Sequence, residues 1–111
     1  MNKVELMGRM TKDIEMKKGK NDTIYGIFTL AINRKENKEL TDFVNCVAFG
    51  KLAETIKLYT EKGNRIIVTG ALHFDNYTTK DGETKTSCNI IVDDFYFVDF
   101  KQKDKTTENT F

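Results

Sequence analysis

The chain has 111 residues, of which 39% are hydrophobic and 32% are charged. This length and composition are typical of one globular domain and leave no room for a second domain of ordinary size. The formal net charge of +1 gives no indication of a polyanionic partner, and the apolar runs are too short to cross a membrane. No secretion-signal core follows Met1, so we expect a cytoplasmic protein.

The first half of the chain has the alternating pattern of β-strands. Every second residue from Val4 to Met10 is apolar or glycine, which predicts a half-buried strand. Residues 18–22 are polar and predict a loop, and alternation returns over 24–34 as a second strand. After a polar turn, a third strand is expected over 41–50.

The period then changes to that of a helix between Lys51 and Lys62, and Gly63 is expected to end this helix. Its apolar stripe consists of Leu52, Ala53, Ile56 and Tyr59. A fourth strand is predicted over 65–74 and a fifth over about 85–100. They flank a hairpin tip at 78–83 that contains an Asp-Gly turn.

This order predicts an all-β fold with one helix, namely an OB fold. An OB fold is a five-stranded Greek-key barrel, and the helix falls here between strands 3 and 4. An SH3-like barrel is the main alternative, although it would not need a helix of this length. We expect the domain to cover residues 1–100 and the polar segment 101–111 to be a short, disordered tail.

The third strand carries the most information about function. Val44, Cys46 and Ala48 share one parity and suit the interior of a small barrel. This assignment turns Phe43 and Phe49 outward, where a stacked base, another subunit or another part of the chain would have to cover them. If the parity is reversed, both rings fill the barrel instead.

Tyr77, near the hairpin tip, is a third candidate for base stacking, and its alternative role is to brace the hairpin. Basic residues are spread among the neighbouring strands and loops. Each could be an ordinary solvated charge, but together they would form a phosphate-binding groove beside the aromatic rings. The set comprises Arg9, Arg34, Lys35, Lys51, Lys80 and Lys85.

The sequence contains no motif for catalysis or for a metal or cofactor. Cys46 and Cys88 lack a metal-site spacing and are expected to be buried free thiols, and His73 is the only histidine. Asp93 and Asp94 are adjacent, so in a strand they would point to opposite faces and could not act as one acid–base pair. We therefore predict a protein that is not an enzyme.

Four segments carry a resemblance to a known family. They read MNKVELMGRMTKD over 1–13, FTLAINR over 28–34, DFVNCVAFGKLAE over 42–54 and VTGAL over 68–72. In this context they resemble the bacterial single-stranded DNA-binding protein family, and the match extends from residue 1 to about residue 99.

The resemblance implies an OB fold that binds single-stranded DNA without strong sequence preference, in replication, recombination or repair. It places stacking aromatics at Phe43, Phe49 and Tyr77, and the motif lysine at Lys51. It also implies a homotetramer, or else a dimer, in which first strands pair between subunits. The residues assigned to that interface are Asn2, Val4 and Leu6. The alternatives are a primosome-type protein-interaction adaptor and an RNA-preferring barrel.

The chain departs from the family pattern at several positions. Glu36 stands where many members have another stacking aromatic, and residues 73–76 replace a basic stretch with HFDN. Residues 106–111 retain a terminal Phe111 and one acidic residue, without the long linker and acidic tip of many members. This pattern suggests a short, linkerless form in which the tail recruits few partners.

Overall fold

The computed structural model describes residues 1–99, which form one sheet of six strands and one helix. The strands are β1 (Val4–Met10), β2 (Glu15–Lys18), β3 (Ile24–Asn33), β4 (Thr41–Phe49), β5 (Arg65–Thr78) and β6 (Thr84–Phe97). The helix is α1 (Gly50–Tyr59), and a short 3-10 turn covers Lys20–Asp22. The predicted tail at 101–111 lies outside the described residues.

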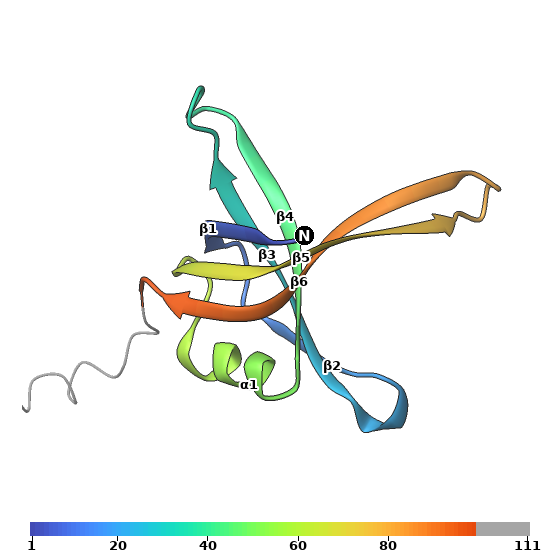
Figure 1. Ribbon diagram of the computed structural model, residues 1–111, viewed down its shortest axis with the longest axis horizontal. Helices are drawn as coiled ribbons and strands as arrows, with labels where there is room; N and C mark the ends of the chain where they lie inside the picture. Colours follow the sequence, from blue (N-terminus) through green and yellow to red (C-terminus); the bar gives the residue numbers. More distant parts are fainter. Residues whose placement is uncertain (100–111) are drawn as a thin grey trace, which may run out of the picture.

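The sheet closes into a barrel. Its strand order is β1-β5-β6-β4-β3-β2, and a pairing between β1 and β3 completes a ring of five strands (Figure 1). All neighbours are antiparallel except β4 and β6, which run parallel from Asn45↔Asn89 to Val47↔Ile91. The structure thus confirms the predicted five-stranded barrel with one helix between the strands 41–49 and 65–78.

The short strand β2 was not predicted. It pairs with the first part of β3, from Glu15↔Ile27 to Lys18↔Ile24, whereas β1 pairs with Ala31 and Leu30 of β3. The chain bends at Thr11 and Lys12 between β1 and β2, and Ile14, only 3% exposed, then packs into the core. Because β2 reads EMKK, with three charged residues in four, its sequence has no apolar alternation.

Apolar side chains from every barrel strand and from α1 fill the interior. Twelve residues form this core: Met10, Ile14, Phe28, Leu30, Cys46, Ala48, Ala53, Ile56, Ile66, Val68, Ile90 and Val92. Because these side chains fill the interior, the barrel is a packed core and not a channel. Burial of each of the larger side chains contributes roughly 1.5–3 kcal/mol to stability. Within residues 1–99, no helix has the length and apolar character needed to cross a membrane.

The helix ends earlier than predicted. Its last residue is Tyr59, because Thr60 takes an extended backbone (φ −125°, ψ 159°) and its hydroxyl donates to the Ile56 carbonyl at 2.6 Å. Gly63 therefore does not end α1 but lies in a later turn, where its N–H donates to the Met10 carbonyl at 2.8 Å. Ala53 and Ile56 are buried as expected, whereas Tyr59 is 46% exposed.

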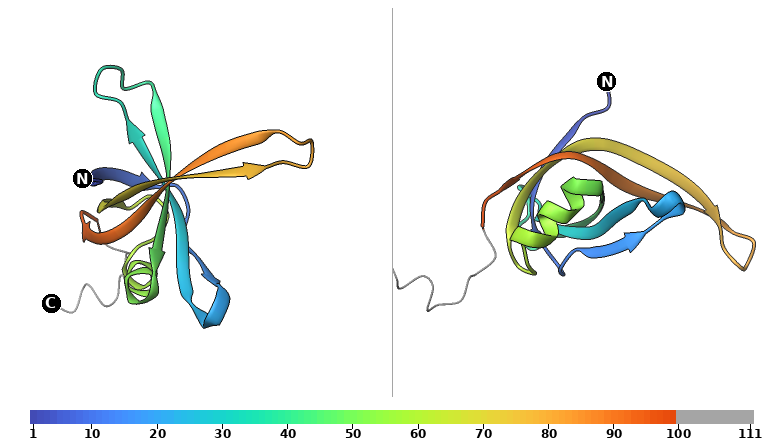
Figure 2. Two further views of the ribbon diagram at one scale, coloured as in Figure 1. Left: turned by 45° about the vertical axis from the view of Figure 1, so that its right-hand side comes forward. Right: turned by 90° about the horizontal axis from the view of Figure 1, so that it is seen from below.

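Hairpins project from the barrel. Figure 2 shows the β3–β4, β5–β6 and β2–β3 hairpins radiating from the common centre. In the longest, the pairing of β5 with β6 continues to Thr78↔Thr84, so β5 is longer than the predicted strand over 65–74.

The prediction of two buried thiols was wrong for Cys88, which is exposed on the β5–β6 hairpin. Cys46 is buried, and this burial raises the pKa of its thiol to about 12.

A β-bulge interrupts β6 where it crosses β5. Thr69 is opposite Asp94 and Gly70 is opposite Val92, so Asp93 is the extra residue. The expectation that Asp93 and Asp94 point to opposite faces was wrong, because the bulge leaves both of them exposed. Asp93 accepts a hydrogen bond from the Thr69 hydroxyl at 2.6 Å, and Asp94 accepts one from the Tyr96 hydroxyl at 3.1 Å.

Candidate nucleic-acid interface

The outer face of β4 carries the two predicted phenylalanines. The side chains of Phe43 and Phe49 are 67% and 47% exposed, whereas Cys46 and Ala48 are at most 1% exposed. The parity predicted for this strand is therefore confirmed. The alternative with both rings inside the barrel is excluded.

Neighbouring strands extend this face through their register. Phe43 is opposite Ala31 and Phe49 is opposite Tyr25, whose ring centroid lies 6.0 Å from that of Phe49. Tyr25 was not singled out from the sequence. Its position beside Phe49 follows from the β3–β4 register. This register depends on the length of the turn between the two strands, which the apolar pattern does not give.

Tyr77 lies on the same sheet face. Asn45 of β4 is in register with Asn89 of β6, and Asn89 is opposite His73 of β5. Tyr77 has the parity of His73, so it continues the face that carries Phe43 and Phe49 onto the projecting hairpin. Its side chain is 50% exposed and is opposite Lys85. Phe74, 64% exposed, has the other parity and lies on the opposite face of the hairpin.

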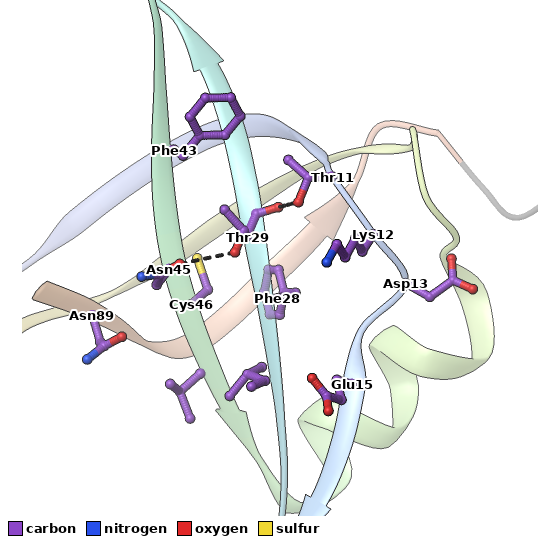
Figure 3. Close-up of a pocket in the computed structure, with 12 residues that line it drawn as sticks. Thr11, Lys12, Asp13, Glu15, Phe28, Thr29, Phe43, Asn45, Cys46 and Asn89 are labelled. Atoms are coloured by element: carbon purple, nitrogen blue, oxygen red, sulfur yellow. Dashed lines mark hydrogen bonds between the residues drawn. The ribbon is translucent and has the colours of Figure 1, made fainter. Parts of the chain in front are cut away.

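A groove of about 550 Å³ runs beside Phe43 on this face. Figure 3 shows its lining residues, which come from β2, β3, β4, β6 and the segment between β1 and β2. Lys12 is the basic residue in the lining, and it was not among the predicted phosphate contacts. Phe49 and Tyr77 do not line this groove, so the three aromatic candidates occupy separate places on one face.

The predicted basic residues fall into two groups. The guanidinium of Arg34 forms an ion pair with Asp42 (Nη2 to Oδ1, 3.0 Å), and that of Arg9 donates to the Gly63 carbonyl at 2.8 Å. The four lysines are exposed, and within residues 1–99 they form no ion pair. These lysines are Lys35, Lys51, Lys80 and Lys85.

The residues assigned to the oligomer interface lie on or beside β1. The Asn2 amide bonds the backbone of Leu72 twice, both times at 2.9 Å, and Val4 and Leu6 pack against the core. Their side chains are thus used within the subunit. Only Arg9 and Met10 of β1 pair with β3, so within residues 1–99 the rest of that edge has no neighbouring strand.

Comparisons with known proteins point in one direction. Residues 1–98 match the model of the single-strand binding protein family. A single-stranded DNA-binding protein of Clostridium perfringens is 41% identical over 89% of this chain and 67% of its own length. One from Fusobacterium nucleatum is 38% identical over 99% of this chain and 75% of its own. One from onion yellows phytoplasma is 35% identical over 93% and 99%.

Proposed function

Since this chain belongs to the single-strand binding protein family, we propose that it binds single-stranded DNA by stacking unpaired bases on Phe43, Phe49 and Tyr77. Family membership makes it an OB-fold DNA-binding protein and not an enzyme. The stacking mechanism is the further step, and it rests on the rings themselves.

The observation that carries this step is the exposure of three aromatic side chains on one sheet face. Phe43, Phe49 and Tyr77 are 67%, 47% and 50% exposed. Stacking on such rings contributes about 1–3 kcal/mol per base and depends little on sequence, because every base has a π-face. Duplex DNA is disfavoured, since its bases are already stacked on one another.

Lysines close to these rings supply the phosphate contacts. Lys51 lies two residues after Phe49, Lys85 is opposite Tyr77, and Lys12 lines the groove beside Phe43. Each phosphate neutralised on a single strand contributes a slope of roughly −0.7 to the dependence of log K on log salt. Lys35 in the β3–β4 loop and Lys80 in the β5–β6 loop extend the same basic surface.

The family assignment also supports a biological setting. We assign the protein to the protection of exposed strands in replication, recombination or repair in the cytoplasm. We assign residues 1–100 to the binding domain and residues 101–111 to a tail. A homotetramer would bring several stacking surfaces to one strand, and such multivalency raises affinity by about 10² to 10⁴.

The test compares substitutions on the two faces of the molecule. We expect Phe43→Ala and Phe49→Ala each to weaken binding of oligo-dT by about 1–3 kcal/mol, because each removes one stacking surface. Phe74→Ala is the matched control, since it removes an equally exposed ring from the opposite face of the β5–β6 hairpin. Binding is measured by fluorescence titration at fixed salt, and folding by circular dichroism.

Two results would contradict the stacking assignment. One is a folded Phe43→Ala or Phe49→Ala protein that binds oligo-dT as tightly as the parent. The other is a loss in Phe74→Ala as large as the loss in the β4 variants, which would place the DNA on the other face.

A further inference from the structure

Asn45 has a fixed orientation in the middle of the outer face of β4. The Thr29 hydroxyl donates to its Oδ1 at 3.0 Å across the β3–β4 pair. This bond occupies one lone pair of the oxygen and turns the amide nitrogen away from Thr29, toward the side where Asn89 lies (Figure 3). Asn45, which lines the groove beside Phe43, therefore directs its N–H groups to the side of the groove where Asn89 lies.

Asn89 places a second amide beside the first. The two asparagines are in register across the parallel β4–β6 pair, and both line the groove that contains Phe43. Within residues 1–99 the side chain of Asn89 forms no hydrogen bond. It supplies one acceptor and two donors whose direction is set by rotation of the amide.

Two adjacent amides match the hydrogen-bonding edge of an unpaired base. Thymine and guanine present a carbonyl acceptor next to a ring N–H donor, and adenine and cytosine present a ring nitrogen acceptor next to an amino donor. A fixed donor and an adaptable amide satisfy all four pairs. Asn45 and Phe43 are two residues apart on one strand face, about 6.7 Å, which is comparable to the breadth of a base.

We infer that Asn45 and Asn89 bind the Watson–Crick edge of a base stacked on Phe43. This inference rests on the proposed function and deepens it. The amide pair selects a base whose pairing edge is free, whichever base it is. The preference for single-stranded over duplex DNA then has two sources. The base must have an unstacked face for Phe43 and an unpaired Watson–Crick edge for the two amides.

The decisive probe is an oligonucleotide of N3-methylthymidine, compared with oligo-dT of the same length. The methyl group removes the ring N–H and blocks the edge, but it leaves the flat ring and the phosphates in place. A good bidentate contact distinguishes a matching base edge from a mismatched one by about tenfold or more, so we expect the protein to bind the methylated strand about tenfold more weakly. Asn45→Ala and Asn89→Ala should bring the ratio of the two affinities close to one.

The chain provides a matched control for these variants. Asn76 accepts a hydrogen bond from the Thr86 hydroxyl at 2.8 Å, as Asn45 does from Thr29, but it has the parity of Phe74 and lies on the opposite face of the hairpin. Asn76→Ala should keep the tenfold ratio. A second variant, Thr29→Val, frees Asn45 to rotate and should reduce the ratio without abolishing it.

The outcomes separate this inference from the proposed function. If the protein binds both strands equally well, or if Asn45→Ala and Asn89→Ala keep the parental ratio, the amides do not read the edge, although stacking stands. If the protein does not bind oligo-dT at all, the proposed function itself fails. The comparison of the two strands needs only the unmodified protein, so a variant that misfolds cannot obscure the result.

Discussion

Arg34, directly after β3, makes a forked contact with Asp42, the residue before Phe43. Its Nε and Nη2 donate to Oδ2 and Oδ1 of the carboxylate at 3.1 and 3.0 Å. These hydrogen bonds raise the pKa of Arg34 and lower that of Asp42. The carboxylate thus offsets the charge of the arginine that the sequence assigns to a phosphate.

We expect Asp42→Asn to strengthen oligo-dT binding severalfold at low salt, because it removes the anionic partner of Arg34. The released guanidinium would neutralise one more phosphate, so the slope of log K against log salt should steepen by about 0.7. Glu54→Gln is the control, since it makes the same change of charge on α1. Equal effects of the two substitutions would indicate a general charge effect and not the release of Arg34.

The same ion pair has a defined pH range. Because the pKa of Asp42 lies below its ordinary value of 3.8, its carboxylate stays ionised at neutral pH and is protonated only as pH falls through the lowered value. The contact with Arg34 is lost in that acid range. Titration of DNA binding between pH 5 and pH 8 should therefore show no step from this pair.

Single residues differ in how far the local sequence predicts the position and the contacts of their side chains. The outward position of Phe43 and Phe49 follows from the small side chains between them, so it could be predicted. The pairing of Arg34 with Asp42 depends on the β3–β4 register, and the pairing of Asn45 with Asn89 on contact between strands distant in the chain. No local pattern indicates either contact.

At the scale of elements, the β5–β6 hairpin extends beyond the point where its apolar alternation stops. Past Leu72 it is held by polar cross-strand contacts, such as the hydrogen bond between Thr86 and Asn76. The alternation rule identifies strands that face a core, so it ended this strand at residue 74. It missed β2 because the sequence EMKK has no apolar alternation, although Met16 packs against the core. Cys88 was expected to be buried because it lacks a metal-site spacing, but it is exposed on the part of β6 that projects from the barrel.

The β-bulge in this hairpin depends on Gly70. A Cβ atom at this position would overlap with the backbone carbonyl oxygen of Ile91 in the opposite strand. We expect Gly70→Ala to destabilise the protein by about 3 kcal/mol, because the backbone of β6 would have to move. The measurement is the melting temperature at one fixed protein concentration.

Gly82, at the hairpin tip, provides the comparison. It has a φ of +84°, but a Cβ atom added there would meet no other atom within 4 Å, so Gly82→Ala carries only the conformational cost of about 1–2 kcal/mol. Gly70→Ala should therefore lower the melting temperature more than Gly82→Ala. The opposite order would show that β6 adjusts easily at the bulge.

At the scale of the whole molecule, the open edge of β1 offers a site where the strand of another copy could pair. Its residues from Val4 to Gly8 pair with β5 on one side only, within the described part of the chain. An edge of this kind is a template for pairing with another chain. The side chains of Asn2, Val4 and Leu6 are engaged within the subunit, so a partner strand would meet the backbone of β1.

This geometry makes a prediction for amide hydrogen exchange. In an antiparallel pair alternate residues direct their N–H groups away from the partner, so a set of amides in β1 points away from β5. If first strands pair between subunits, these amides should exchange as slowly as those bonded to β5. Exchange is followed by NMR at several protein concentrations, and sedimentation gives the mass under the same conditions.

The dependence on concentration separates assembly from other sources of protection. Dilution shifts an oligomer toward subunits by mass action, so protection of the outward amides should fall while that of the amides bonded to β5 persists. A particle with the mass of several chains but rapid exchange at these amides would place the contact on another face. A single-chain mass at all concentrations would remove multivalency as a source of affinity, and binding would then depend on one barrel's rings and lysines alone.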